Sequence, residues 1–107
     1  MRELFLVGAN QTHRGDRQYL YLIIYDIIDN RNRNKVFKYL KSYGTPVQKS
    51  CFETYLSERQ FSRLEKRLIK MIDWETDNVR IYQMNGLNKV YNYGVKNVNA
   101  YIDLLIL

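Results

Sequence analysis

The residues best suited to chemistry lie where a hydrophobic segment ends at an acidic residue and gives way to basic ones. The segment YLYLIIYDIIDNRNRNKV, residues 19–36, reaches Asp26 and then becomes polar and basic. A carboxylate is a hard oxygen ligand suited to Mg²⁺ or Mn²⁺, whereas Arg and Lys bind phosphates. An acid, a metal ion and a basic helix together suit phosphodiester hydrolysis. Asp26 is therefore the main candidate for a catalytic, metal-binding residue.

A structural role for Asp26 is an equal alternative at this level. A carboxylate at the start of a helix accepts hydrogen bonds from free backbone N–H groups, and either Asp26 or Asp29 could act in this way. A single carboxylate also seldom makes a metal site. A two-fold dimer presents one residue twice near its axis, so a site with one acid per chain requires a dimer in which the two Asp26 residues face each other.

Other residue types exclude several kinds of active site. The only histidine, His13, lies in the segment NQTHRGDRQ, which is typical of a loop or of disorder, so we expect no Ser-His-Asp triad; with the one cysteine it also provides too few ligands for a zinc site. The segment GANQTHRG lacks the Lys-Ser/Thr ending of a phosphate-binding loop. We expect Cys51 to pack in the core. A single cysteine excludes an intrachain disulfide and fits a reducing cytoplasm.

Length and charge favour one domain that binds an anionic partner. The chain has 107 residues and a formal net charge of +6, for which nucleic acid is the commonest partner. No apolar run approaches the length of a membrane-spanning helix, and LFLV near the start is too short for the core of a signal peptide. We therefore expect a cytoplasmic protein without a membrane partner.

Basic residues dominate the segment after Asp26. Between Asn30 and Phe52 there are six Lys or Arg and no acidic residue. Like charges on neighbouring helical positions repel, which favours a phosphate-binding surface over an ordinary solvated face. The candidates include Arg31, Arg33 and Lys38. Phe52 and several tyrosines could stack on bases, although core packing is the more common role for such rings.

The periodicity of apolar residues predicts alternating strands and helices. Strands are expected at residues 19–25 and 78–84, and an extended segment over 46–56 is expected to kink or turn around 48–50. Helices are expected over 29–44 and from a capping box at Ser57 to about Ile72. Residues 85–107 lack a helical period and are expected to contain one or two short strands. With the middle segment folded as a hairpin, the order is βαββαβ, an α+β fold of the ferredoxin-like plan.

Three segments in order resemble the CRISPR-associated Cas-two family. They are LIIYDIIDNRNRNKVFKYLKSYG, VQKSCFE and RLIKMIDWETDNVRIYQM, which together cover roughly residues 19–84. The resemblance implies a ferredoxin-like protomer with an antiparallel sheet, in a two-fold homodimer whose C-terminal strands extend the partner's sheet. It divides the chain into an N-terminal extension (1–18), the ferredoxin-like domain (19–86) and a dimerisation tail (87–107).

The same resemblance implies a role in CRISPR adaptation. The homodimer would scaffold the Cas-one integrase and bind nucleic acid, with Mg²⁺-dependent endonuclease activity on single-stranded RNA or double-stranded DNA. Asp26 of each subunit would bind the metal ion. Further site residues fall at positions that the family uses: Tyr25, Arg33, Lys35 and Phe52. The alternative is a non-catalytic ferredoxin-like module that binds nucleic acid. Two departures from the family pattern are the 18 extra N-terminal residues and Pro46, where a basic residue is frequent.

Overall fold

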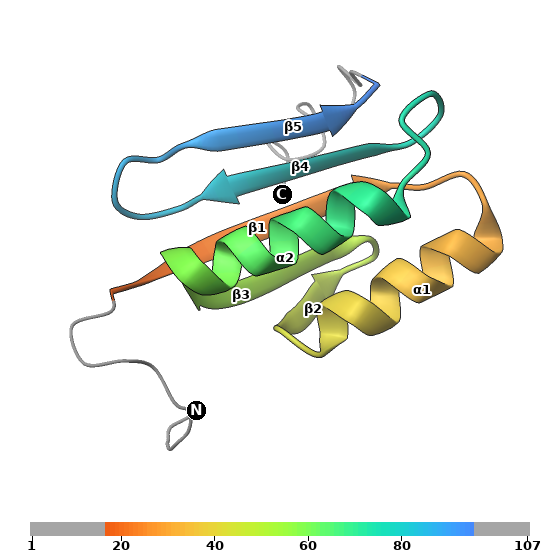
Figure 1. Ribbon diagram of the computed structural model, residues 1–107. Helices are drawn as coiled ribbons and strands as arrows, with labels where there is room; N and C mark the ends of the chain where they lie inside the picture. Colours follow the sequence, from red (N-terminus) through yellow and green to blue (C-terminus); the bar gives the residue numbers. More distant parts are fainter. Residues whose placement is uncertain (1–16, 96–107) are drawn as a thin grey trace.

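The hydrophobic segment that ends at Asp26 forms the central strand of an antiparallel sheet. The structure is a computed structural model that describes residues 17–95. Strand β1 (Gln18–Asp26) pairs with β3 (Cys51–Ser57) on one side and β4 (Asn78–Gln83) on the other. The five strands lie in the order β2-β3-β1-β4-β5, where β2 is Thr45–Gln48 and β5 is Val90–Gly94 (Figure 1). The first four strands and two helices confirm the predicted ferredoxin-like plan.

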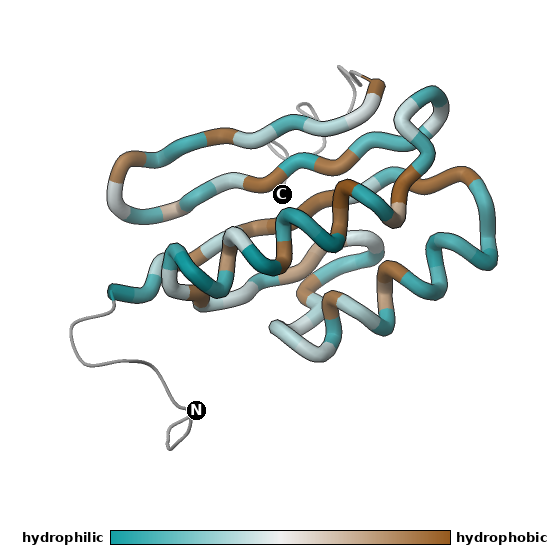
Figure 2. The backbone as a smooth tube through the Cα atoms, in the orientation of Figure 1, coloured by the Kyte–Doolittle hydropathy of each residue, from teal (hydrophilic) through white to brown (hydrophobic). Residues whose placement is uncertain are grey.

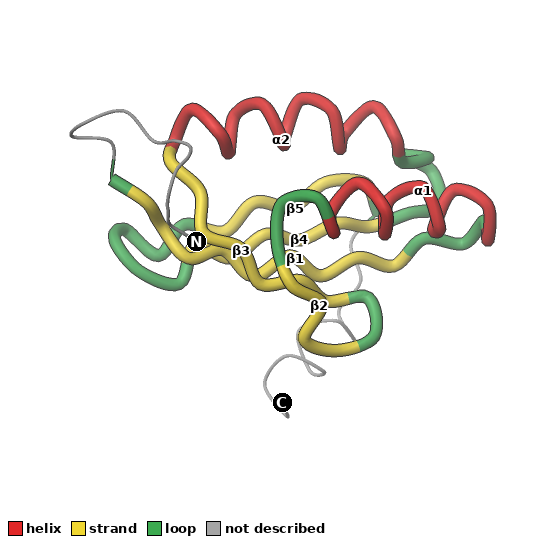
Figure 3. Tube along the Cα trace, turned by 90° about the horizontal axis from the view of Figure 1, so that it is seen from below, coloured by secondary structure: helices red, strands yellow, loops and turns green. Residues whose placement is uncertain are grey.

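Both helices cover one face of this sheet. Helix α1 (Asn30–Lys41) follows β1, and α2 (Glu58–Met71) follows β3; Figure 3 shows the two in one layer above the strands. The predicted capping box starts α2, since the Ser57 side chain accepts from the Gln60 backbone N–H and the Gln60 side chain accepts from Ser57. The crossover helices therefore sit on the side toward which alternate residues of β1 point.

The core lies between the sheet and the helices. From α2 it takes Phe61, Leu64 and Leu68, whose spacing places them on one side of the helix. The Phe61 ring stacks on Tyr21 of β1 with centroids 4.5 Å apart. Most of the length of both helices is hydrophilic, with short hydrophobic segments between (Figure 2). The outer surface of the helical layer is thus left to polar and charged side chains.

The predicted kink in the middle segment is a tight turn between two strands. Strand β2 ends at Gln48 and β3 begins at Cys51, with Ser50 at a positive φ of 60°. The pairing of β2 with β3 shifts register between Pro46 and Gln48. Strand β2 lies at the edge of the sheet, which is where proline is tolerated because it has no N–H to donate. Cys51 is buried as expected, and burial raises the pKa of its thiol.

The ends of the chain fall partly outside the described residues. This applies to most of the predicted extension (1–18) and to YIDLLIL at the end of the predicted tail (87–107). Within the tail, β5 is one of the short strands expected there, and it pairs with β4 of its own chain. Pairing of a C-terminal strand with a partner subunit stays a prediction. No helix within residues 17–95 is long and apolar enough to cross a membrane.

Candidate nucleic-acid and metal site

Asp26 is the last residue of the central strand. It pairs with Asn78 at the start of β4, and its side chain is exposed. Its neighbour Tyr25 belongs to the core on the helical side of the sheet. Since side chains alternate along a strand, Asp26 lies on the opposite face, together with Leu22 and Ile24. The carboxylate is therefore carried at the end of a rigid strand, on the face that α1 and α2 do not cover.

Asp29, and not Asp26, caps α1. The Asp29 carboxylate accepts a hydrogen bond of 2.8 Å from the Asn32 backbone N–H, and its own backbone is extended as an N-cap requires. The structure thus decides between the two capping candidates and leaves the metal-binding hypothesis open for Asp26.

Arg33 anchors the loop that joins β1 to α1. Its guanidinium donates to the backbone oxygens of Ile27 at 2.8 Å and Ile28 at 3.4 Å, and to the Asn30 side chain at 2.6 Å. These bonds turn the guanidinium toward the loop that follows Asp26. Arg33 therefore has a defined structural role in addition to its predicted contact with nucleic acid.

Tyr25 and Phe52, both predicted to contact nucleic acid, lie in the core. Tyr25 is 4% exposed and Phe52 1% exposed, with ring centroids 6.3 Å apart. Phe37 of α1 packs edge-on against Phe52 at 5.4 Å. Burial raises the pKa of Tyr25, an effect that the nearby Arg33 partly offsets. In this arrangement neither ring presents a face to a base, because apolar burial against the helices competes with exposure to a ligand.

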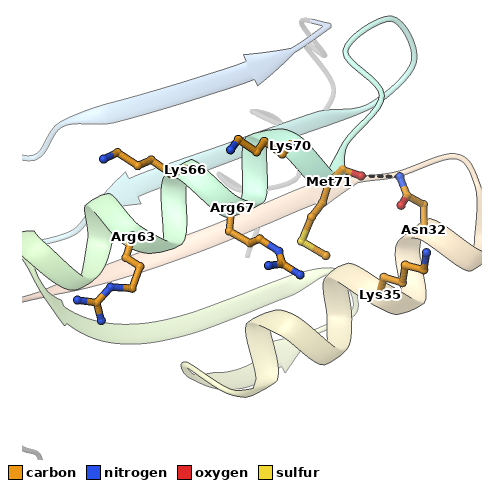
Figure 4. Close-up of a pocket in the computed structure, with 7 residues that line it drawn as sticks. All are labelled: Asn32, Lys35, Arg63, Lys66, Arg67, Lys70 and Met71. Carbon is orange, nitrogen blue, oxygen red and sulfur yellow. Dashed lines mark hydrogen bonds between the residues drawn. The ribbon is translucent and has the colours of Figure 1, made fainter.

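The remaining predicted contacts are exposed side chains of α1. Arg31, Lys35 and Lys38 have spacings of four and three residues, so they form one stripe along the helix. Lys35 also lines a pocket together with cations of α2 that were not among the predicted contacts. These are Arg63, Lys66, Arg67 and Lys70, which with Lys35 line a pocket between the helices (Figure 4). The α2 residues also recur at helical spacing, but only the packing of α2 beside α1 brings them to Lys35.

A buried carboxylate holds the loops next to Asp26. Asp77 is 1% exposed and accepts hydrogen bonds from the Ile28 backbone N–H at 3.0 Å, from Asp73 N–H at 2.8 Å and from the Thr76 hydroxyl at 3.1 Å. It therefore ties the β1–α1 loop to the loop between α2 and β4. Nothing in the neighbouring sequence marks Asp77 as buried, because its donor Ile28 is 49 residues away in the chain.

Replacing Asp77 by Ala is expected to destabilise the fold by about 2–3 kcal/mol, because two backbone N–H groups would lose their acceptor in a part-buried site. Urea denaturation followed by circular dichroism measures this loss. Asp73→Ala is the matched control, since Asp73 is exposed and its carboxylate accepts from the Glu75 backbone N–H within its own turn. Equal losses in both variants would contradict the bridging role of Asp77.

One chain alone does not supply a complete metal site. Within residues 17–95 no group of three or more His, Cys, Asp or Glu is placed to hold a metal ion. Asp26 contributes one exposed carboxylate, and Mg²⁺ commonly takes one or two carboxylates with water completing its shell. The residues thus fit a metal ion only if a second carboxylate, such as that of a symmetry-related Asp26, lies opposite.

The chain is similar to a family of CRISPR-associated proteins. The family model described as CRISPR associated protein Cas2 matches residues 19–89. A protein from Synechocystis named CRISPR-associated endoribonuclease Cas2 3 is 46% identical over 68 residues, covering 64% of this chain and 74% of that protein. One from Thermus thermophilus named CRISPR-associated endonuclease Cas2 2 is 43% identical over 75 residues, covering 70% and 83%.

Solved structures share the fold. A hypothetical protein from Thermus thermophilus, TT1823, superposes with a TM-score of 0.62 at 40% identity, covering 74% of this chain and 96% of that one. A crystal structure described as cas2 gives a TM-score of 0.59 at 32% identity, covering 76% and 91%. The family-model match over residues 19–89 holds β1 from Tyr19 on, strands β2 to β4, both helices and Asp26.

Proposed function

This chain belongs to the CRISPR-associated Cas2 family, and we propose that it acts in CRISPR adaptation as a cytoplasmic, nucleic-acid-binding homodimer with endonuclease activity. The observation that carries the proposal is the family match over residues 19–89, which includes the strand that ends at Asp26. Relatives named as endoribonucleases and endonucleases support phosphodiester hydrolysis as the reaction. Double-stranded DNA and single-stranded RNA are the proposed substrates.

The second face of the sheet is the proposed dimer interface. Leu22 and Ile24 lie half-buried on the face opposite the helices, and by alternation Asp26 shares this face. Two copies packed through these faces about a two-fold axis would bury the apolar side chains. If the axis runs along β1, they would also bring the two Asp26 carboxylates to the same end of the interface. In this arrangement, the metal site would be complete only in the dimer, because each subunit supplies one Asp26 carboxylate.

Asp26 of each subunit would hold Mg²⁺, or alternatively Mn²⁺, at this end. A metal ion bound there supplies charge stabilisation for a phosphodiester and lowers the pKa of bound water. The protein's own part is to hold each carboxylate at the end of a rigid strand. Arg33 and Asp77 fix the loop that follows, and Arg31, Lys35 and Lys38 attract the phosphate backbone.

A second proposed role is that of a scaffold for the Cas-one integrase, which needs the dimer and its basic surfaces but not Asp26. The alternative is a non-catalytic ferredoxin-like module, which binds nucleic acid through its basic surfaces and does not cleave it. The exposed cations of α1 support binding under either proposal, whereas cleavage depends on Asp26.

The dimer is tested by the mass of the purified chain in sedimentation velocity, with Leu22→Lys as the variant. We expect the wild type to sediment with twice the mass of one chain and to co-purify with the Cas-one integrase. Leu22→Lys is expected to sediment as a monomer because it places a charge in the interface. Ser62→Lys places the same charge on the exposed side of α2, away from the proposed interface, and should leave the dimer intact. A wild type that remains monomeric at high concentration would contradict the proposed assembly.

A further inference from the structure

The α1–α2 groove is a concentration of positive charge on the helical layer. We define it by the five cations that line it: Lys35 of α1 and Arg63, Lys66, Arg67 and Lys70 of α2 (Figure 4). The remaining lining residues are Asn32 and Met71, so no carboxylate lines the groove. Within residues 17–95 none of the five cations makes an ion pair. The groove therefore presents a field of one sign to solvent.

Contacts between the helices fix the shape of the groove. The Asn32 side chain donates a hydrogen bond of 2.6 Å to the Met71 backbone oxygen, which joins the start of α1 to the end of α2 (Figure 4). Arg67 reaches from α2 toward α1, and its guanidinium lies 5.8 Å from the centre of the Tyr39 ring. The two helices that form the groove are thus linked before any ligand binds, which reduces the conformational entropy lost on binding.

The charge arrangement disfavours the isolated helix. Arg63 and Arg67, like Lys66 and Lys70, are four residues apart on α2, and such like-charge neighbours cost about 0.2–0.5 kcal/mol each. Glu65 is the acid nearest to them in the helix, but it lies one or two residues from Arg63, Lys66 and Arg67, so it does not face them; it accepts a hydrogen bond from the Tyr93 hydroxyl on the sheet. A solvated helix face usually mixes charges to avoid this repulsion. An external anion would relieve it.

The spacing of the cations matches a phosphate backbone. Arg63 and Lys70 are seven residues apart, or about 10 Å along α2. Successive phosphates of one strand rise about 3.4 Å along the duplex axis, so this length of α2, lying parallel to that axis, would pass about three phosphates. No aromatic residue lines the groove, which leaves no platform on which an unpaired base could stack.

We propose that the α1–α2 groove binds the sugar-phosphate backbone of a nucleic-acid duplex through charge alone, on the face of the sheet opposite to Asp26. The inference rests on the proposed function, since it takes nucleic acid as the ligand, and it assigns to α2 a contact beyond the predicted residues of α1. Because Asp26 points to the other face, backbone held in the groove is bound without being presented to that carboxylate. An acidic polypeptide is the competing ligand.

The test compares two triple variants that lose the same charge. The groove variant carries Arg63→Gln, Lys66→Gln and Lys70→Gln; the control carries Lys41→Gln, Lys49→Gln and Lys89→Gln, all exposed and outside the groove. Binding of a 20-base-pair duplex, a single strand of equal length and poly-glutamate is measured over a series of salt concentrations. Circular dichroism and thermal melting of both variants show that each is folded.

We expect the groove variant to lose about tenfold or more in duplex affinity and the slope of log K against log salt to fall by about 2–3. The control should change the slope by less than about 1. The melting temperature of the groove variant should not decrease, because the substitutions remove repulsion within α2.

Equal losses in the two variants would overturn the inference, since binding would then follow net charge and not the groove. Loss of poly-glutamate binding with duplex binding retained would also overturn it and identify a protein partner. A wild type that binds no nucleic acid at all would instead defeat the proposed function. The experiment therefore distinguishes a wrong inference about the groove from a wrong proposed function.

Discussion

Replacing Asp26 by Asn is expected to reduce metal-dependent cleavage of RNA or duplex DNA by roughly a hundredfold or more. The change removes a negative charge from each subunit and, in the proposed dimer, weakens both protein ligands of the metal ion at once. The side chain keeps its size and its exposed place at the end of β1, so the fold should be unaffected. Cleavage of end-labelled substrates with and without Mg²⁺ measures the effect.

Asp29→Asn is the matched control for that change. It alters the charge equally, three residues further along, and asparagine caps a helix about as well as aspartate. Calorimetric titration with Mn²⁺ adds a readout apart from activity: one ion per dimer is expected for the wild type and the control, and none for Asp26→Asn. Full cleavage by Asp26→Asn would end the catalytic proposal, while retained duplex binding in that variant would favour the scaffold role.

Local patterns were sufficient to predict most of the fold. The alternation in β1, the capping box at Ser57 and the apolar spacing of α2 each depend on residues close in sequence, and all appear in the structure. The turn at Lys49 and Ser50 was located for the same reason, since the alternation slips there. What these patterns lack is any information on which helix faces meet.

The site was harder to predict because it depends on distant pairs. Lys35 was recognised within a basic run, but its grouping with the cations of α2 arises only when the two helices pack side by side. Asp77 lies in an acidic loop and is buried only because Ile28, 49 residues away, donates to it. The position of a second Asp26 depends on a symmetry that one chain does not contain.

The sequence around Phe52 is compatible with two roles for its ring, a contact with nucleic acid or packing in the core. Its place in VQKSCFE supported a contact with nucleic acid, whereas its alternation along β3 equally supports burial. Replacing Phe52 by Ala is expected to destabilise the fold by about 3–5 kcal/mol, because the ring is 1% exposed and packs between Tyr25 and Phe37. Urea denaturation measures the loss. Lys66→Ala on the exposed side of α2, which truncates a long side chain outside the core, should cost less than about 1 kcal/mol.

Phe52→Leu then separates packing from recognition. Leucine restores most of the apolar volume, so stability should recover to within about 1.5 kcal/mol of the wild type. It has no aromatic face, so a stacking contact with a base, worth about 1–3 kcal/mol, would be lost. Because the ring is enclosed by the core, we expect affinity for both duplex and single strand to remain within about twofold of the wild type. A stable Phe52→Leu protein with tenfold weaker binding to single strands would show instead that the core opens to expose this ring, and that Phe52 contacts nucleic acid directly.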